Sequence, residues 1–161
     1  MIRDYQAICK TWFPKGQQRI IPTYGRHYGA KLMGTLNYET GEIYIEENDK
    51  YDAEVFLSFL KKIIIKYSGK IVVILDNARI HHAKLLQDFL EKNKDRLSLV
   101  FLPPYSPNLN MIEELWGWLK NSVINNDFFS NLNEIKVAVR KFLSWVNLYP
   151  VLVINRLCVQ Y

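Results

Sequence analysis

The sequence predicts a mixed α/β fold in which helices pack on a sheet, and three observations support that prediction. Two strand-like stretches, 31–38 and 42–46, are joined by the turn Glu39-Thr40-Gly41, which is typical of a hairpin. A continuous apolar run, 71–75, and a largely apolar stretch, 97–102, have the composition of strands inside a sheet. Apolar residues at helical spacing lie between and after these runs. Strands that alternate with helices favour a layered α/β fold.

Before residue 70, a strand, the hairpin and then a helix are expected. Residues 17–25 look like the strand that precedes the hairpin. From Asp52 the apolar residues recur at the spacing of a helix, and Ser68-Gly69 ends that helix. Its expected apolar face consists of Phe56, Leu60, Ile63, Ile64 and Tyr67.

In the middle of the chain a strand, a helix and a second strand are expected. Ile71–Leu75 is a continuous apolar run, which predicts a strand buried on both faces. A second helix follows, with Leu86, Phe89 and Leu90 inward. The apolar strand Leu97–Leu102 comes next and is stopped by Pro103-Pro104.

Two more helices are expected after this strand. The third begins at Asn110, where Asn110 and Glu113 match a capping box. The fourth begins at Asn131, where Asn131 and Glu134 match a second one, and stops near Tyr149-Pro150. The expected apolar face of the third is Leu109, Ile112, Trp116, Leu119 and Val123, and that of the fourth is Ile135, Ala138, Val139, Phe142 and Val146.

Length and composition indicate one domain that covers residues 1–161. The chain is 49% hydrophobic and contains no internal repeat, linker or low-complexity tract. Its apolar runs are too short for a membrane span, which needs about 18 residues or more. The N-terminus has no apolar signal segment, so we expect a cytoplasmic protein. Two cysteines, Cys9 and Cys158, are too few for a disulfide framework or a structural zinc site.

Charge is unevenly distributed along the chain. The net charge is +5, and residues 1–35 carry six lysines and arginines against one acid, Asp4. The same stretch contains Trp12, Phe13 and Tyr24, a mixture that suits a nucleic-acid surface. An ordinary solvated basic face would have the same composition. Charge alone does not decide between these two interpretations.

Two acids at the ends of elements are candidate metal ligands. Asp76 follows the strand Ile71–Leu75, where ligands gather in open α/β sheets, although an Asp-Asn turn is the simpler alternative. Glu113 either caps its helix or binds a metal. One helix and one strand separate the two acids, which is enough chain to bring them together. Clustered carboxylates hold Mg²⁺ or Mn²⁺, and a two-metal site performs phosphodiester chemistry. Lys120, two turns beyond Glu113, is placed to meet a phosphate, and Gly117 leaves room for DNA.

The segments that carry these acids resemble a known family. "VVILDNARIHHAK" followed by "LVFLPPYSPNLNMIEELWGWLK" is similar to the mariner-type DDE superfamily transposases, in particular their bacterial insertion-sequence branch. The upstream "TWFPKGQQ" and "KLMGTLNYETGEIY" extend the resemblance over most of the chain. Met111 departs from the pattern, because many relatives have proline there. The resemblance implies a ribonuclease-H-like mixed sheet with flanking helices.

The resemblance also implies a function and the residues that carry it. It predicts metal-dependent DNA strand cleavage and strand transfer, with two Mg²⁺ or Mn²⁺ ions in the complete enzyme. Asp76 matches the second catalytic acid and Glu113 the third, so Glu113 is expected both to cap its helix and to bind a metal. His81 matches the histidine of the Asp-Asn-Ala element, which lies near DNA or has a structural role. Transposon ends and target DNA are the expected partners, in a homodimeric assembly without a membrane. From the residues themselves, we expect Arg79, Lys84 and Lys120 to contact the DNA.

The start of the chain departs from the family pattern. By the family's spacing, the first catalytic aspartate falls just before Met1, and Asp4 lies in the loop after that position. The N-terminal helix-turn-helix region of the family has no counterpart. We therefore expect a catalytic domain that lacks its first strand. A non-catalytic DNA-binding remnant and a stand-alone ribonuclease-H-like nuclease are the alternatives, and the tryptophan-rich third motif disfavours the nuclease.

Overall fold

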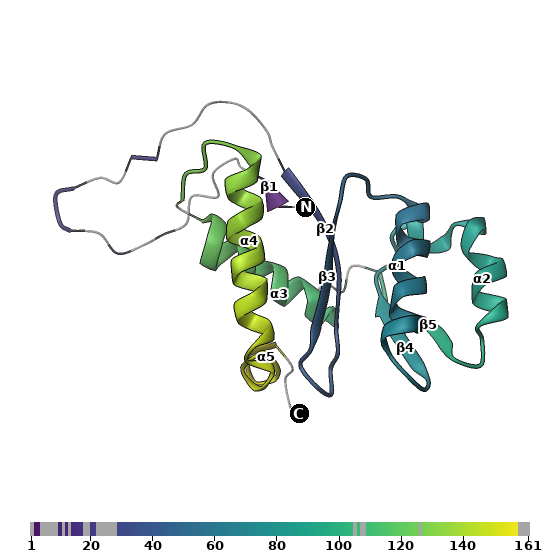
Figure 1. Cartoon of the computed structure of the whole chain (residues 1–161). Helices are drawn as coiled ribbons and strands as arrows, with labels where there is room; N and C mark the ends of the chain where they lie inside the picture. Colours follow the sequence, from purple (N-terminus) through teal and green to yellow (C-terminus); the bar gives the residue numbers. More distant parts are fainter. Residues whose placement is uncertain are drawn as a thin grey trace.

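A computed structural model describes residues 2–3, 10, 12, 14–17, 20–21, 29–104, 106, 109–125 and 127–157. These residues form a mixed α/β fold, which confirms the predicted class. Hydrogen bonding divides their strands into an antiparallel sheet, in the order β1-β2-β3, and a parallel pair, β4-β5. In Figure 1 the hairpin β2–β3 stands between two groups of elements, with α3, α4 and α5 on one side and α1, α2, β4 and β5 on the other.

The predicted hairpin is present. β2 (Gly29–Leu36) pairs antiparallel with β3 (Ile43–Asn48), in a register that runs from Lys31 opposite Asn48 to Leu36 opposite Ile43. β1 (Ile2–Arg3) pairs with the start of β2. The turn closes at Gly41, which has a φ of 74°. The strand expected at 17–25 lies largely outside the described residues, and its described positions, 17, 20 and 21, are not in a strand.

The two faces of the hairpin belong to two hydrophobic cores, because side chains alternate along a strand. Ala30, Leu32 and Ile43 lie in the core formed with α3, α4 and α5. Met33 lies in the core formed with α1, β4 and β5, and Tyr44 packs against that core. The hairpin is therefore the middle layer of the molecule.

Helix α1 (Ala53–Lys66) confirms the predicted first helix. Asp52 is its N-cap and accepts a hydrogen bond from the backbone N–H of Val55 at 3.0 Å. Gly69, with a φ of 78°, follows the end of the helix. The buried face is Phe56, Phe59, Leu60 and Ile63.

The parallel pair is present, but the prediction that its first strand is buried on both faces is wrong. β4 (Ile71–Leu75) pairs in register with β5 (Leu97–Phe101). Leu75 is buried on the α1 side, whereas Val72 is 62% and Ile74 59% exposed on the other. An apolar run shows that a strand is suited to burial, but only packed neighbours bury it. Between the strands lie short 3₁₀ turns, Arg79–His82 and Lys84–Leu86, and helix α2 (Gln87–Lys92).

The last helices differ from the prediction in detail. α3 (Met111–Leu119) continues into a π-helical turn, Lys120–Ile124. Its buried residues are Leu115, Trp118 and Leu119, while Leu109 from the predicted face is exposed. Asn110 is the N-cap by position, but its side chain makes no capping hydrogen bond, so the predicted capping box is wrong there.

α4 (Leu132–Asn147) has the predicted cap and apolar stripe. Asn131 Oδ1 accepts from the N–H of Glu134 at 3.0 Å, and the Glu134 carboxylate accepts from the N–H of Ser130, one residue earlier than in the standard box. Hydrogen bonds from the Ser130 side chain and backbone and from Asn131 lower the pKa of Glu134. The sequence prediction missed α5 (Pro150–Leu157), which begins at the proline that was expected to end the helical region. Proline is well tolerated in a first helical turn.

No single helix in the described part of the chain is long and apolar enough to cross a membrane. α4 and α5 meet the length and apolarity requirements only as a pair, and a bend of 95° separates them.

Candidate active site

Asp76 lies on the surface at the carboxyl end of β4. Its side chain is 58% exposed, and Oδ1 accepts a hydrogen bond from the backbone N–H of Ala78 at 3.0 Å. The next residue, Asn77, donates from Nδ2 to the carbonyl of Leu102 at 2.5 Å and so ties this turn to the end of β5. Asp76 therefore forms the turn that its Asp-Asn sequence suggested, and it also presents an exposed carboxylate. The two interpretations are compatible.

His81 lies behind Asp76 and is buried, with only 9% of its surface exposed. Its Nδ1 is 3.1 Å from the backbone carbonyl oxygen of Asp76 and 3.2 Å from Oδ1 of the same residue. The imidazole packs on the Phe56 ring of α1, with the ring centres 4.4 Å apart. Burial favours the structural role for His81 over direct contact with DNA.

Glu113 lies in the first turn of α3 and is exposed. Its backbone N–H donates to the Asn110 carbonyl at 2.9 Å, which belongs to the start of the helix. Within the described part of the chain, its carboxylate has no hydrogen-bond or ion-pair partner. Neither half of the expected capping box is formed, so the carboxylate of Glu113 remains available to a ligand.

Packing of α3 on the hairpin sets the position of Glu113. Trp116 packs against the core that α3 shares with β2 and β3. The close approach requires glycine at position 34, because a Cβ there would lie 3.3 Å from Cη2 of Trp116 and 2.6 Å from Cγ1 of Ile45. On the other side of α3, Trp118 is buried against Phe142 of α4. The tryptophans of the third motif thus hold the helix that carries the acid.

Tyr51 is a candidate site residue that the sequence did not indicate. It lies in the loop between β3 and α1 and is half exposed. Burial raises the pKa of its phenol, and the negative charges of Asp76 and then Glu113 raise it further. Both carboxylates are therefore near enough to one phenol to act on it. Nothing in the sequence around Tyr51 could have revealed this proximity, because it depends on how the elements that carry Asp76 and Glu113 pack near the loop between β3 and α1.

The chemistry of the two acids fits a hard cation, but their number is small. Asp76 and Glu113 are exposed carboxylates, the ligand type that Mg²⁺ and Mn²⁺ prefer. The described residues contain no cluster of three or more histidine, cysteine, aspartate and glutamate side chains. Asp4 lies outside the described residues. Within the described part of the chain, the candidate ligands at this site are thus the carboxylates of Asp76 and Glu113.

The predicted DNA-contacting lysines and arginine are all exposed. Arg79 begins the 3₁₀ turn that follows Asp76, and Lys84 begins the next such turn. Lys120 lies at the start of the π-helical turn after α3 and is exposed, as expected. Most of the basic segment 1–35 lies outside the described residues, so its placement relative to Asp76 stays a prediction.

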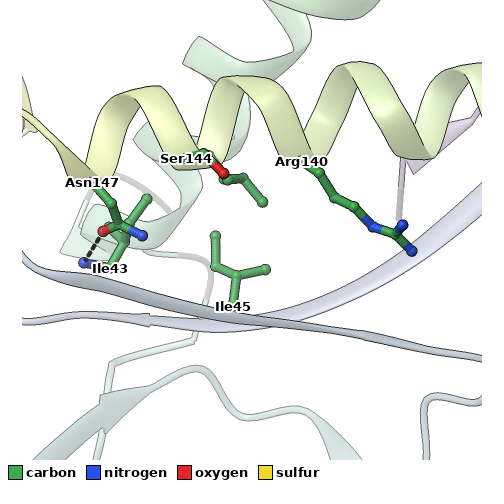
Figure 2. A pocket seen from close by; sticks show the side chains of 6 residues that line it. Ile43, Ile45, Arg140, Ser144 and Asn147 are labelled. Atoms are coloured by element: carbon green, nitrogen blue, oxygen red, sulfur yellow. Dashed lines mark hydrogen bonds between the residues drawn. The ribbon is translucent and has the colours of Figure 1, made fainter.

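A pocket of about 230 Å³ lies between β3 and α4, apart from these acids. Figure 2 shows Asn147 of α4 reaching the strand, where its Oδ1 accepts from the N–H of Ile43 at 3.2 Å. Arg140, at the other end of the pocket, donates to Glu47 at 3.0 Å. The side chains of Asn147 and Arg140, which line the pocket, thus fasten α4 to β3. We regard this pocket as part of the framework.

The sequence of this chain matches a family model and two curated proteins. The family model described as DDE superfamily endonuclease matches residues 1–136. The insertion element IS630 39 kDa protein of Shigella sonnei is 29% identical over 145 residues, which cover 89% of this chain and 42% of that protein. Protein y4pE/y4sA of Sinorhizobium fredii is 36% identical over 64 residues, which cover 40% of this chain and 44% of that protein. The chain therefore spans less than half the length of these relatives.

Three of the structural neighbours are complexes of Mos1. The Mos1 strand transfer complex matches all of this chain and 53% of its own, with a TM-score of 0.62 and 14% identity. The Mos1 paired-end complex with the left transposon end matches 96% of this chain and 52% of its own, with a TM-score of 0.65 and 13% identity. A Mos1 mariner paired-end complex with Mn covers 93% and 47%, with a TM-score of 0.64 and 17% identity. These likenesses show the ribonuclease-H-like fold.

Proposed function

The chain belongs to the DDE superfamily endonuclease family, as a transposase domain of the mariner and IS630 type, and we propose that it serves metal-dependent cleavage and joining of DNA strands. One observation indicates which residues perform this function. Asp76 and Glu113 come from separate elements, are both exposed, and both act on the phenol of Tyr51. Two exposed acids of a transposase domain that both lie near one phenol suit a shared ligand.

Asp76 and Glu113 are the proposed protein ligands of Mg²⁺ or Mn²⁺. Asp76 offers Oδ2, because the hydrogen bonds that it accepts within the described residues fall on Oδ1. Glu113 offers both carboxylate oxygens. Bound divalent ions supply Lewis-acid chemistry, which activates the attacking oxygen and stabilises the leaving one. Mos1, a structural neighbour, is described in a complex with Mn, which supports this choice of metal.

DNA is the proposed partner. The Mos1 neighbours are a strand transfer complex and a complex with a transposon end, so the fold is used on DNA ends in that protein. In this chain Arg79 and Lys84 each begin one of the two 3₁₀ turns that come after Asp76, and Lys120 lies two helical turns beyond Glu113. Cations that flank the acids would hold the phosphates on either side of the scissile bond. Pairing of two transposon ends would bring two copies of the chain together.

A third carboxylate is required for full activity under this proposal. A two-metal mechanism needs ligands on both sides of the scissile phosphate, and the described residues contain no group of three or more candidate ligands placed to hold a metal ion. We therefore expect residues 1–161 alone to bind Mn²⁺ weakly and to nick DNA slowly. A remnant that binds DNA without cleaving it is the alternative.

Mn²⁺ binding and plasmid nicking test the proposal together. We would measure free Mn²⁺ by electron paramagnetic resonance and nicking of supercoiled DNA for the unmodified chain, Asp76→Asn, Glu113→Gln and the control Glu114→Gln. Glu114 is exposed and adjacent, but lies about 100° around the helix. Loss of Mn²⁺ binding in the first two variants alone is expected. Unchanged binding in both would refute the site, and binding without any nicking would support the remnant.

A further inference from the structure

We propose that His81 is a positioning residue that fixes the side-chain rotamer of Asp76, so that Oδ1 faces the protein and Oδ2 faces the site. The inference rests on the proposed function in one respect, namely that Asp76 is a metal ligand. The geometric part does not depend on it. An exposed aspartate ordinarily populates more than one rotamer, and a ligand that must hold an ion benefits from a fixed orientation.

Two donors converge on one oxygen of Asp76. The backbone N–H of Ala78 donates to Oδ1 at 3.0 Å, and Nδ1 of His81 lies 3.2 Å from the same atom. Nδ1 also lies 3.1 Å from the backbone carbonyl oxygen of Asp76, which accepts only. Nδ1 therefore carries a proton, shared between the carbonyl and the carboxylate. A carboxylate held through one oxygen in this way keeps the other oxygen turned away from the donors.

The core holds His81 itself in place. Its ring is tilted by 45° on the ring of Phe56, a residue that is buried in α1. Its backbone N–H donates to the carbonyl of Ala78 at 2.9 Å, which closes the 3₁₀ turn. The contacts thus run from the buried face of α1 through the imidazole to the exposed carboxylate. A well-packed donor loses less freedom on forming its hydrogen bond than a mobile surface donor would.

Neighbouring His82 provides the contrast. It is exposed and stacks on Phe101 at the end of β5, with the ring centres 4.4 Å apart. It lies on the same short turn and has the same chemistry as His81, but no hydrogen bond joins it to Asp76 within the described residues. Direct metal binding by His81 is disfavoured, since its Nδ1 is used by Asp76 and the ring is buried.

Three variants distinguish a positioning role of His81 from a role in packing alone. His81→Phe keeps a ring against Phe56 and removes the donor. His81→Asn places a side-chain N–H near the position of Nδ1 and should restore the hydrogen bond. His82→Phe is the matched control. We would measure the Asp76 χ1 populations from three-bond NMR couplings, the Mn²⁺ Kd by electron paramagnetic resonance, and the Tm of each variant.

His81→Phe should broaden the Asp76 rotamer populations and weaken Mn²⁺ binding about tenfold, as removal of a group that orients a metal ligand typically does. His81→Asn should stay within about twofold of the unmodified chain in Kd. A single Asp76 rotamer in folded His81→Phe would overturn the proposal, whatever the metal does. Absence of Mn²⁺ binding in the unmodified chain would instead refute the proposed function and leave the rotamer result to stand alone. If His81→Phe does not fold, Phe56→Leu is the second variant, because it removes the ring that packs on the imidazole. Unchanged Asp76 couplings in Phe56→Leu would also overturn the proposal.

Discussion

The acids of this chain differ in how they are used, and hydrogen bonding explains the difference. Asp76 is held through one oxygen by Ala78 and His81, whereas the Glu113 carboxylate has no partner in the described part of the chain. Glu46 and Glu47 on β3 form ion pairs with helices instead, Glu46 with Lys62 of α1 and Glu47 with Arg140 of α4. The ion-paired glutamates of β3 fasten elements together, whereas Oδ2 of Asp76 and the carboxylate of Glu113 remain for a ligand.

The phenol of Tyr51 should report the presence of both candidate ligands. Because nearby negative charge disfavours the phenolate, Asp76→Asn and Glu113→Gln should each lower the Tyr51 pKa toward its ordinary value of 10.0. The fall should be larger for Asp76→Asn, the stronger of the two influences. A ¹³C-NMR titration of the Tyr51 ring measures it, with Glu114→Gln as the control. A change in the Tyr51 pKa with only one of the two substitutions would show that only that acid lies near the phenol, which contradicts a shared site.

At the scale of elements, the contact between β3 and α4 depends on Glu47. Burial by itself would raise the pKa of Glu47, but hydrogen bonds and charges from Lys136 and Arg140 outweigh burial and lower it below 4.5. The folded state therefore binds a proton less readily than the unfolded chain. The stabilisation is fully present above about pH 4.5 and is lost as the pH falls through the lower, folded-state pKa.

Glu47→Gln should accordingly lower the free energy of unfolding by about 1 kcal/mol at pH 7, a value reduced for partial exposure. The difference between variant and unmodified chain should shrink below pH 4.5, which urea unfolding at several pH values would measure. Glu39→Gln, in the exposed hairpin turn, is the control. A deficit that persists at low pH would show that the ion pairs are not its source.

Two glycines should respond to alanine in opposite directions. Gly34→Ala places a Cβ 2.6 Å from Ile45 Cγ1 and 3.3 Å from the Trp116 ring, so it should lower the free energy of unfolding by about 1–3 kcal/mol and disturb α3. Gly117, inside α3, has no atom within 4 Å of such a Cβ, and alanine there should add about 0.5–1 kcal/mol. Thermal unfolding measures both. Equal effects of the two substitutions would contradict this account of how α3 packs on the hairpin.

The sequence predicted the helices and strands more accurately than it predicted which of their faces are buried. Apolar spacing predicted α1 and α4, the capping box predicted the N-cap of α4, and apolar runs predicted β4 and β5. The exposure of Val72, the buried side of α3 and the helix after Pro150 were missed, because each depends on which segment packs alongside. For the same reason the motifs indicated Asp76 and Glu113, while Tyr51 and the Asp76 contact of His81 became visible only in three dimensions.

At the scale of the whole molecule, exposed cations should make DNA binding sensitive to salt. Affinity should fall steeply with ionic strength and vary little with sequence, because phosphate contacts release counterions. Arg79→Ala and Lys120→Ala should each reduce the slope of log K against log[salt] by about 1. Lys94→Ala, which removes an exposed lysine paired with Glu91 beyond α2, should not. Fluorescence anisotropy with a labelled duplex measures the slopes. Equal slopes for all variants would show that DNA does not contact Arg79 or Lys120.

The central claim is that Asp76 and Glu113 bind the same metal ions, and paramagnetic broadening by Mn²⁺ tests it most directly. A ¹³C-labelled chain would receive substoichiometric Mn²⁺ while the side-chain carboxyl resonances are followed. We predict that Asp76 and Glu113 broaden first and together, with Tyr51 close behind, while Glu114 and Asp88 stay sharp. Broadening of one acid without the other, or of all exposed carboxylates equally, would contradict the claim.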